Sequence, residues 1–431
     1  MVGSSATDVA IIGVGPYGLS LAAHLSAHEV EYRIFGEVMG SWKDNMPPGM
    51  LLKSYPWATC LSDFHSEFSV KSFCSKRALP YHDEMMPLPL GRFIEYGEAF
   101  RARYVPTVER RTLISLEPCA DVFRATFADG ETVLARRVVV AVGLHPFRRL
   151  PQEADSLPDA LYSHSSEYGS LAPLDGKDVI VIGSGSSASD LTALLHERGT
   201  QVALVARQSE LHFADRPRPR RLLERAAAPM SGIGHGWTLR TCAKYPQLIH
   251  LLPENLRVRL ACTRALGPLG GAFVKERVVG EVPLWLGRSI HCAEARNGKV
   301  TLDLADTGGR RQSLQADHVV FATGYKIDVG RLGFLSPAIL RRLHLVDRAP
   351  RLSRHYETSV PGLHFIGPVA ASSFGPVCRF VYGCGHPARH LARYLATSRQ
   401  RRASSRTLAR SVELGTAPAL VPEPQESEVV S

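Results

Sequence analysis

The stretch Asp8-Val-Ala-Ile-Ile-Gly-Val-Gly-Pro-Tyr-Gly18 decides how this chain begins to fold. Its apolar start predicts a buried parallel strand, because helices cover both faces of such a strand. Its three glycines have the G-x-G-x-x-G spacing, which permits a tight turn, a close approach of the backbone to a pyrophosphate and close packing of the next helix. The stretch therefore predicts a dinucleotide-binding strand–turn–helix unit. The residues expected at the cofactor are Gly13, Gly15, Pro16, Tyr17 and Gly18.

The segment after this unit supplies further candidates for the cofactor site. A second strand is expected over Val30 to Phe35. An acid that binds the ribose hydroxyls belongs about 20 residues beyond the glycines, which makes Glu37 the candidate. A long segment rich in Trp, Met and Pro then runs to Phe64, and long ordered loops are more often functional than connecting. Its apolar side chains are suited to cover a flavin ring, and we expect Trp42 and Asp63 in the cofactor site.

The opening pattern recurs in the middle of the chain. A strand over Val179 to Ile182 leads into Gly183-Ser-Gly-Ser-Ser-Ala188, in which alanine replaces the third glycine, as the fingerprint allows. The following strand, Gln201 to Val205, ends in Ala206 and Arg207 instead of an acid. Arginine pairs bidentately with a ribose 2′-phosphate, so NADPH is favoured over NADH. The residues expected at this cofactor are Gly183, Gly185, Ser186, Ser187, Ala188 and Arg207.

Two such units imply two bound dinucleotides, FAD in the first and a nicotinamide cofactor in the second, so that hydride passes between them. We expect an α/β fold with two Rossmann-like dinucleotide-binding domains, in which the NAD(P) domain is inserted into the FAD domain. The expected boundaries are 1–165 and 318–397 for the FAD domain, 166–317 for the NAD(P) domain with a helical substrate-pocket segment at about 210–285, and 398–431 for a disordered tail.

Composition narrows the class of protein. The 431 residues contain 45% hydrophobic and 21% charged side chains, as in globular proteins, and no apolar run approaches the roughly 20 residues that span a bilayer. A signal peptide is not evident, and the eight cysteines form no C-x-x-C pair. These features predict a cytoplasmic protein with reduced thiols, no membrane partner and no metal site.

The net charge of +10 does not by itself indicate a nucleic-acid partner. Six arginines lie between Arg393 and Arg410, and five lie between Arg216 and Arg225 in a proline-interrupted loop. Neither run is a basic helix interleaved with aromatic residues, and no nucleic-acid-binding motif is present. We expect these arginines to form a solvated surface, with attraction of anionic cofactors and substrates as a secondary effect.

Local patterns also predict the order of elements in the first domain. Val122 to Phe127 and Thr132 to Leu134 flank Asp129-Gly130, which predicts a β-hairpin. Val138 to Val142 predicts a separate, buried parallel strand. The segment from Arg92 to Phe100 predicts an amphipathic helix.

Four motifs together resemble those of the flavin-dependent monooxygenases with two dinucleotide-binding domains. They are the two glycine runs, His164-Ser-Ser-Glu-Tyr168 and Ala322-Thr-Gly-Tyr325, in the order found in that family. The chain is most similar to the branch with the flavin-containing monooxygenases and the N-hydroxylating ornithine and lysine monooxygenases, over roughly residues 8 to 395. The resemblance implies that the two polar motifs mark the crossings between domains. It also implies cofactor contacts from Thr323, Gly324 and Tyr325.

The resemblance also implies a reaction. NAD(P)H reduces FAD, O₂ adds to form a flavin hydroperoxide, and one oxygen atom passes to the substrate, while the protein excludes water. The Baeyer–Villiger fingerprint requires an aromatic residue and a glycine upstream of the histidine, which Leu161-Tyr-Ser-His164 does not supply. Lactone formation from ketones is therefore not expected.

Two basic residues are candidates for the catalytic site. Alignment of Cys60-Leu-Ser-Asp-Phe64 with the similar run of flavin-containing monooxygenases places Lys53 where that group has an asparagine near the flavin. We hypothesise that Lys53 lies over the flavin and favours an anionic substrate or a developing peroxide charge. The alternative is a surface lysine in a loop. Arg379 is suited to clamp an anion beside the flavin, or to form a structural ion pair.

The expected enzyme is an FAD- and NAD(P)H-dependent monooxygenase whose partners are O₂ and a small, polar, nitrogen-containing substrate. The specific hypothesis is conversion of urate to 5-hydroxyisourate, in purine metabolism, because Lys53 and aromatic loop residues suit an anionic ring. The alternative within this class is N-hydroxylation of an amine or amino acid such as ornithine or lysine. A non-oxygenating flavin reductase would need a cysteine pair at the flavin, and a flavin-binding sensor would not need two intact fingerprints.

Overall fold

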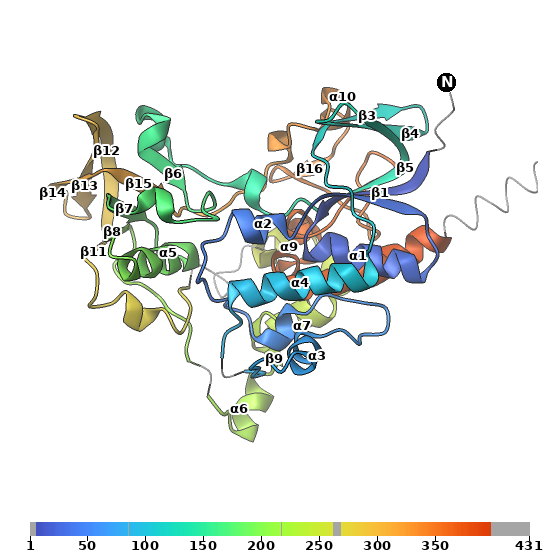
Figure 1. The fold of residues 1–431 in the computed structure, drawn as a ribbon, viewed down its shortest axis with the longest axis horizontal. Coiled ribbons are helices and arrows are strands. Elements are labelled where there is room, and N and C mark those ends of the chain that lie inside the picture. Colours follow the sequence, from blue (N-terminus) through green and yellow to red (C-terminus); the bar gives the residue numbers. More distant parts are fainter. Residues whose placement is uncertain (1–5, 85, 217, 262–268, 398–431) are drawn as a thin grey trace, which may run out of the picture.

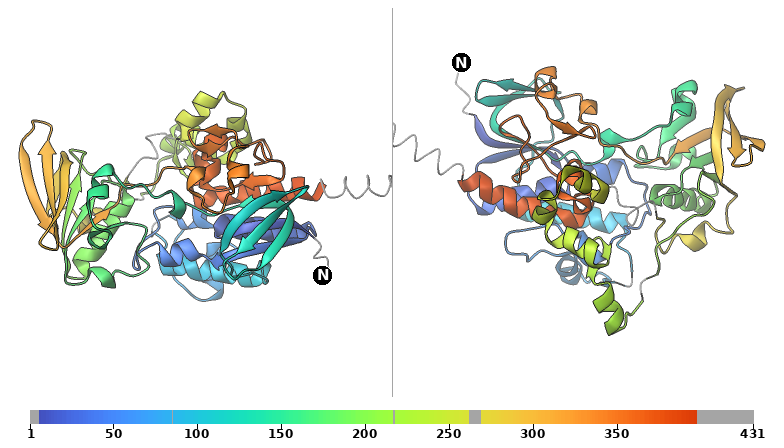
Figure 2. Two further views of the ribbon diagram at one scale, coloured as in Figure 1. Left: turned by 90° about the horizontal axis from the view of Figure 1, so that it is seen from above. Right: turned by 180° about the vertical axis from the view of Figure 1, so that it is seen from behind.

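The structure is a computed structural model that describes residues 6–84, 86–216, 218–261 and 269–397. The ribbon divides into two lobes, each built on a mainly parallel sheet, and the connections between the lobes run between the two sheets (Figures 1 and 2). This arrangement confirms the predicted α/β fold with two dinucleotide-binding domains, one inserted into the other. The expected disordered tail, 398–431, lies outside the described residues.

The first sheet has the strand order β2-β1-β5-β4-β3. Strand β18 pairs with the second half of β5, on the side opposite β1. The pairs β1–β2, β1–β5 and β5–β18 are parallel, whereas β3–β4 and β4–β5 are antiparallel. Its strands are β1 (Thr7–Val14), β2 (Tyr32–Val38), β3 (Leu113–Cys119), β4 (Val122–Phe127), β5 (Thr132–Val140) and β18 (Leu363–Phe365).

The predicted hairpin is confirmed, but its second strand is longer than expected. Thr132 to Leu134 and the apolar run from Val138 form one continuous strand, β5, instead of two. The first half of β5 pairs with β4 in the antiparallel sense, and its second half pairs with β1 and β18 in the parallel sense. Arg136 and Arg137 lie within this strand, and Arg136 donates to the carbonyl oxygen of Ala6 at 2.6 Å.

Helices α1 (Pro16–Ala27) and α4 (Leu90–Tyr104) lie side by side below the first sheet (Figure 1). Helix α4 confirms the amphipathic helix expected there, with Phe93, Tyr96 and Phe100 fully buried. The shorter elements of this domain are α2 (Gly40–Asp44), α3 (Val70–Lys76), α10 (Pro337–Leu340), α11 (Ala371–Phe374), β16 (Leu345–Val346), β17 (Ala349–Pro350), η10 (Pro376–Arg379) and a helix that begins at Gly385.

The second sheet is parallel throughout and has the strand order β11-β8-β7-β15-β6. Helix α5 packs on one of its faces. On the other face lies an antiparallel sheet, β12-β13-β14, which the sequence pattern did not predict. The elements of this domain are β6 (Tyr162–His164), β7 (Asp178–Ile182), α5 (Ser186–Glu197), β8 (Gln201–Ala206), β11 (Leu284–Leu286), β12 (Arg288–Arg296), β13 (Lys299–Asp306), β14 (Arg311–Ala316) and β15 (His318–Phe321).

Strand pairing moves two of the expected domain boundaries. The strands β6 and β15 pair with each other, and β15 pairs with β7, so both belong to the second sheet. The boundaries expected at 165/166 and 317/318 placed these strands in the first domain. They are short, and the partner of a short apolar strand is decided by the tertiary fold and not by its own sequence.

The helical segment expected at about 210–285 does not form one unit of the NAD(P) domain. Helices α7 (Trp237–Lys244), α8 (Pro246–His250) and α9 (Glu254–Ala261) bury Leu239, Cys242 and Ile249 in the core of the first domain. Helix α6 (Leu222–Ala227) instead projects from the body of the molecule (Figure 1, bottom). It follows the segment that connects the second domain to the first. The short hairpin of β9 (Met230–Ser231) and β10 (Gly234–His235) joins α6 to α7.

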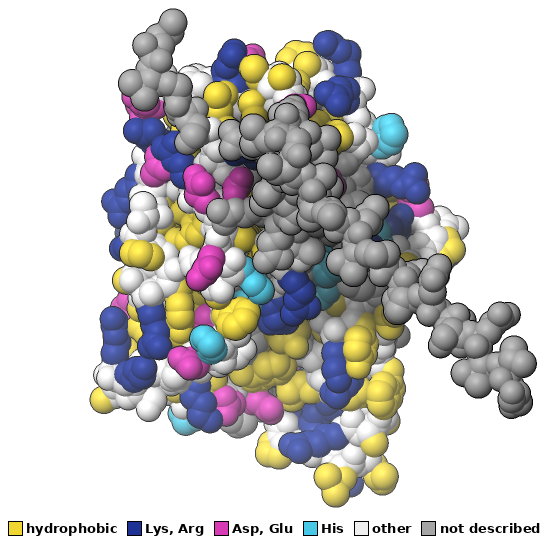
Figure 3. Space-filling view, turned by 90° about the vertical axis from the view of Figure 1, so that its right-hand side faces the viewer, with side chains coloured by type: hydrophobic (Ala, Val, Ile, Leu, Met, Phe, Trp, Pro, Cys, Tyr) yellow, Lys and Arg dark blue, Asp and Glu magenta, His cyan; other side chains and the backbone are white. Residues whose placement is uncertain are grey.

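Charged side chains of both signs are interspersed with hydrophobic ones over the face shown in Figure 3. Many arginines in the described part of the chain are held in ion pairs, as between Arg33 and Glu109 at 2.6 Å. Within the described residues, no helix combines the length and apolar character that crossing a bilayer requires. In the same residues, no group of three or more His, Cys, Asp or Glu side chains is arranged to hold a metal ion.

Candidate functional site

The first glycine turn is closed on its inner side and open on its outer side. A Cβ atom on Gly13 would lie 2.4 Å from the carbonyl oxygen of Ala141, and one on Gly18 would lie 1.9 Å from that of Gly13. Neither position therefore tolerates a side chain. A Cβ on Gly15 would meet no atom within 4 Å. Gly15 also precedes the first turn of α1 without a side-chain cap, which leaves backbone N–H groups available to an anion.

The second turn repeats this geometry at the end of β7. A Cβ atom on Gly183 would lie 2.5 Å from the carbonyl oxygen of Ala322, and Gly185 precedes α5 with no side-chain cap. Ala188 is fully buried, so its methyl group fits where the fingerprint more often has glycine. Both turns thus have the shape and the free N–H groups that suit a pyrophosphate.

The predicted ribose-binding residues lie beside these turns. Glu37 is on β2, whose Val38 pairs with Val14 at the first turn, and its carboxylate lies 3.3 Å from Nζ of Lys43. Arg207 follows β8 directly, and β8 pairs with β7 up to the second turn. Arg207 is exposed. The structure therefore brings both residues to the correct edge of their sheets, and their roles toward the cofactors stay predictions.

Three other predicted cofactor residues have structural partners. The hydroxyl of Tyr17 donates to the carbonyl oxygens of Cys378 at 2.9 Å and Phe380 at 2.8 Å, which ties α1 to η10. The ring of Trp42 packs edge-on against Phe93, with centroids 4.7 Å apart. The buried carboxylate of Asp63 accepts three backbone N–H groups of its own loop, each at 3.1 Å. Asp63 therefore organises this loop, and its contact with a cofactor stays a prediction.

The two crossings between domains lie side by side. Nε2 of His164 is 3.1 Å from the carbonyl oxygen of Gly324, and the His164 and Tyr325 rings meet edge-on with centroids 5.4 Å apart. The hydroxyl of Thr323 donates to the carbonyl oxygen of Arg149. Burial lowers the pKa of His164 to about 4, so its imidazole is neutral at pH 7. The two motifs thus contact each other at the end of the paired strands β6 and β15.

A cleft of about 580 Å³ separates the two domains and is the candidate active site. Its walls come from the loop after Leu51, from residues 213–216, 218 and 220, from residues 269 and 271–274, and from the β9–β10 hairpin. Aromatic and aliphatic side chains predominate, which suits a flat ligand. Its charged lining residues are Lys53, Glu84, Asp215, Arg216, Arg218 and Arg220.

Lys53 extends into this cleft, and its Nζ donates to the carbonyl oxygen of Leu269 across the domain boundary. Desolvation lowers the pKa of Lys53, and the negative charge of Asp190 in α5 partly opposes this effect. Burial raises the pKa of Asp190 to about 6, while a bond from Ser186 and the Lys53 charge act in the other direction. Lys53 is therefore a cleft residue whose amine contacts Leu269 while its side chain remains exposed, and its catalytic role stays a prediction.

Arg379 does not line the cleft that contains Lys53. It is exposed on η10, and its Nη1 donates to the carbonyl oxygen of Ala261 at 3.2 Å. Its neighbour Phe380 lines the cleft instead. The structure does not bring Arg379 together with Lys53, and its role as an anion clamp stays a prediction.

The structure places three arginines of the expected solvated surface, Arg216, Arg218 and Arg220, along the cleft, which the sequence did not predict. Arg216 and Arg218 are exposed there, as expected. Tyr55 and His235 were also missed, and they meet there with ring centroids 6.4 Å apart. The arginine run itself was the signal, but nothing in the sequence says which domain the loop faces.

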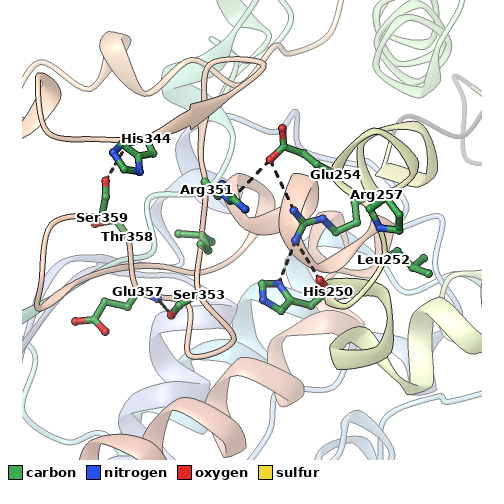
Figure 4. A pocket seen from close by; sticks show the side chains of 12 residues that line it. His250, Leu252, Glu254, Arg257, His344, Arg351, Ser353, Glu357, Thr358 and Ser359 are labelled. Carbon is green, nitrogen blue, oxygen red and sulfur yellow. Dashed lines mark hydrogen bonds and ion pairs between the residues drawn. The ribbon is translucent and has the colours of Figure 1, made fainter.

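A second cavity, of about 560 Å³, lies between the start of α9 and the segment that contains His344 and Ser359 (Figure 4). Glu254 lies between Arg257 and Arg351, at 3.9 and 3.8 Å, and Nη1 of Arg257 donates to the carbonyl oxygen of His250. The positive charges in this cavity are thus partly compensated. None of the predicted site residues lines it.

The sequence of this chain is similar to those of known flavin-dependent oxidoreductases. The model of the family described as pyridine nucleotide-disulphide oxidoreductase matches residues 7–233, which include both glycine turns. The indole-3-pyruvate monooxygenase YUCCA1 of Oryza sativa subsp. japonica is 25% identical over 342 residues, or 74% of this chain and 77% of that protein. An FAD-dependent urate hydroxylase of Xanthomonas campestris is 26% identical over 219 residues, but only 46% of this chain and 44% of that protein are covered.

Solved structures share the fold. The ornithine hydroxylase of Pseudomonas aeruginosa superposes with a TM-score of 0.72 over 91% of this chain and 99% of that one, at 18% sequence identity. This likeness concerns the fold, and it covers a larger share of the chain than residues 7–233.

Proposed function

The chain belongs to the pyridine nucleotide-disulphide oxidoreductase family and is a flavin-dependent monooxygenase that uses FAD and NAD(P)H; from this premise we propose that it hydroxylates a small, polar, nitrogen-containing anion. The observation that carries the proposal is the inter-domain cleft. Four cationic side chains and two acids line it, together with aromatic rings. A cleft with this balance of charge raises the local concentration of small anions.

The two glycine turns fit the two dinucleotides, and the rest of the cleft fits the chemistry between them. Bound FAD, reduced by NAD(P)H, supplies the oxygen-activating chemistry. The uncapped N–H groups in the first turns of α1 and α5 would hold the pyrophosphates. The apolar walls around Leu52 and Val274 keep water from the reacting centre. Lys53 holds positive charge where negative charge develops on the substrate side.

Urate, converted to 5-hydroxyisourate, is the specific substrate that we propose. It is planar, nitrogen-rich and anionic, and its size suits a cleft of about 580 Å³. The similarity to a urate hydroxylase of Xanthomonas campestris supports the choice. We propose that Arg379 strengthens the positive field from the surface next to the cleft. We also propose that the domain boundaries follow the two mainly parallel sheets.

An aromatic 2-oxo acid is the second candidate, because the rice relative acts on indole-3-pyruvate. Such a substrate also combines a flat ring with an anionic group. N-hydroxylation of an amine or amino acid is supported by the fold alone. The excess of cations in the cleft opposes binding of an ammonium-bearing chain.

Disulfide reduction fits the site poorly. The cysteines in the described residues are all unpaired. Cys378 and Cys384 are closest to the presumed flavin loop. Burial raises their pKa values to about 12 and about 11, so neither is a thiolate at pH 7.

The test is a substrate screen with the FAD-loaded enzyme. NAD(P)H oxidation, O₂ uptake and peroxide release are measured with urate, indole-3-pyruvate, ornithine and cadaverine, and products are identified by mass. We expect urate to stimulate NAD(P)H oxidation and to gain one oxygen atom with little peroxide. Turnover of ornithine or cadaverine alone contradicts an anionic substrate, and O₂-independent disulfide reduction contradicts the monooxygenase.

A further inference from the structure

We propose that Arg220 binds the anionic group of the substrate in the inter-domain cleft and thereby restricts the enzyme to planar anions. This inference rests on the proposed function. It adds the residue that recognises the charge and the orientation that the bound molecule takes. Nothing in the glycine turns or the domain crossings assigns a role to Arg220.

The other two cleft arginines already have carboxylate partners. Nη2 of Arg216 lies 2.6 Å from Oε2 of Glu276, and Nη2 of Arg218 lies 3.1 Å from Oε1 of Glu224. These bonds offset the charge of both guanidinium groups and engage their donors. Both guanidinium groups therefore already have a carboxylate partner, although their side chains are 58% and 67% exposed.

Arg220 differs because its partners are neutral. Its Nη2 donates to the carbonyl oxygens of Glu224 and Ala228, each at 2.7 Å, at the end of α6. Its Nη1 is buried and has no hydrogen-bond partner in the described part of the chain. Two carbonyl bonds fix the plane of the guanidinium, and the nearby carboxylate of Glu224, which is itself bonded to Arg218, offsets only part of its charge. The result is a preorganised cation, which is the arrangement that binds a carboxylate or an enolate well.

The surroundings of Arg220 suit a flat molecule. Burial and the charge of Glu84 raise the pKa of Tyr55 against the smaller opposite effect of Arg220, whereas burial and the charge of Arg220 lower the pKa of His235. Tyr55 in turn stacks with Trp57, with ring planes 11° apart. A planar ring bound beside Tyr55 would therefore direct its anionic edge toward Arg220.

Lys53 occupies a separate part of the cleft. Its amine is bonded to Leu269 and coupled to Asp190 of the second domain, whereas Arg220 acts on Tyr55 and His235. Desolvation lowers the pKa of Lys53, while a guanidinium stays charged across the working pH range. The geometry thus separates two tasks: Arg220 holds the permanent charge, and Lys53 faces charge that develops during the reaction.

The central variant is Arg220→Gln, which keeps a polar amide but removes the charge and the Nη2 donor. Arg220→Lys keeps the charge, and Arg225→Met is the matched control, because Arg225 is an exposed arginine of α6 that does not line the cleft. Binding is measured by the change in the flavin absorption spectrum of the oxidised, FAD-loaded enzyme. The probes are urate, indole-3-pyruvate and neutral indole.

We expect the Kd of urate or indole-3-pyruvate to rise at least about tenfold in Arg220→Gln, as for loss of a charged hydrogen-bond partner, and to recover partly in Arg220→Lys. The Kd of indole and the KM of NADPH should stay unchanged, as should all constants of Arg225→Met. Equal binding of anions by wild type and Arg220→Gln overturns the inference, as does failure of the wild type to bind either anion. A rise in the KM of NADPH alone also overturns it, since Arg220 would then hold a nucleotide phosphate. If anions bind through Arg220 but none is oxygenated, the proposed function fails and the assignment of Arg220 stands.

Discussion

The Nε2 atom of His164 lies 3.1 Å from the carbonyl oxygen of Gly324, although the two residues are 160 positions apart in the chain. His164 ends β6 and Gly324 follows β15, and these two strands pair with each other in the second sheet. Nδ1 of the same imidazole lies 2.8 Å from the hydroxyl of Ser166, so both ring nitrogens have partners. This bond therefore fixes the ends of β6 and β15 relative to each other.

Acid should destabilise the fold between about pH 6.5 and pH 4. Burial lowers the pKa of five histidines to about 4, so the unfolded chain binds more protons than the native chain in this window and stability falls as the pH falls. His164, which is fully buried, accounts for about 3 kcal/mol of this loss. These histidines are His24, His164, His318, His364 and His386. The measurement is urea unfolding at a series of pH values, with a flat profile from pH 7 to pH 5 as the contrary result.

Two alanine substitutions in the first turn should separate cofactor binding from folding. Gly15→Ala places a methyl group in open space, so stability should change by less than about 1 kcal/mol while the Kd of FAD rises at least tenfold. Gly18→Ala places a methyl group against the carbonyl oxygen of Gly13 and should cost about 3 kcal/mol or more. Thermal unfolding and FAD titration of both variants provide the comparison. Full FAD affinity in Gly15→Ala contradicts the assignment of this turn.

Arg207→Ala should alter the choice of nicotinamide cofactor. Loss of a bidentate partner for the 2′-phosphate should raise the KM of NADPH about tenfold and leave that of NADH unchanged, because NADH lacks this phosphate. Steady-state rates with both cofactors measure the ratio. A parallel rise in both KM values would assign Arg207 to a general role in folding.

Lys53→Met should impair coupling more than folding. Removal of the amine takes away a positive charge near the reacting centre, so kcat for substrate should fall about 10-fold to 100-fold while uncoupled NADPH oxidation and peroxide release persist. Lys53→Arg should recover part of the loss. Unchanged substrate turnover and coupling in Lys53→Met would remove Lys53 from the mechanism.

Asp63→Ala should destabilise the loop and not the cofactor chemistry. The substitution leaves three backbone N–H groups without their acceptor, at a cost of about 2 to 4 kcal/mol. Asp63→Asn retains one acceptor oxygen and should lose less. The readout is the unfolding temperature together with the Kd of FAD. Loss of FAD binding with the unfolding temperature unchanged would restore Asp63 to the cofactor site.

The sequence by itself determined the two dinucleotide turns and the α/β class. The reason is local: Gly13, Gly18 and Gly183 lie where any side chain would strike a backbone carbonyl, so the requirement is written in the residues themselves. The strands next to these turns are continuous apolar runs, which sequence alone identifies as buried.

Only the tertiary structure decided where the remaining parts of the cleft lie. The strands β6 and β15 are too short to reveal their partners, and the arginine loop from Arg216 to Arg220 faces the cleft because β8 and α7 fix its two ends in different domains. Arg220 and Lys53 are far apart in the chain, and each is bonded to carbonyl oxygens that any residue could supply. No side-chain pattern encodes such partners, so their place follows from packing and not from sequence.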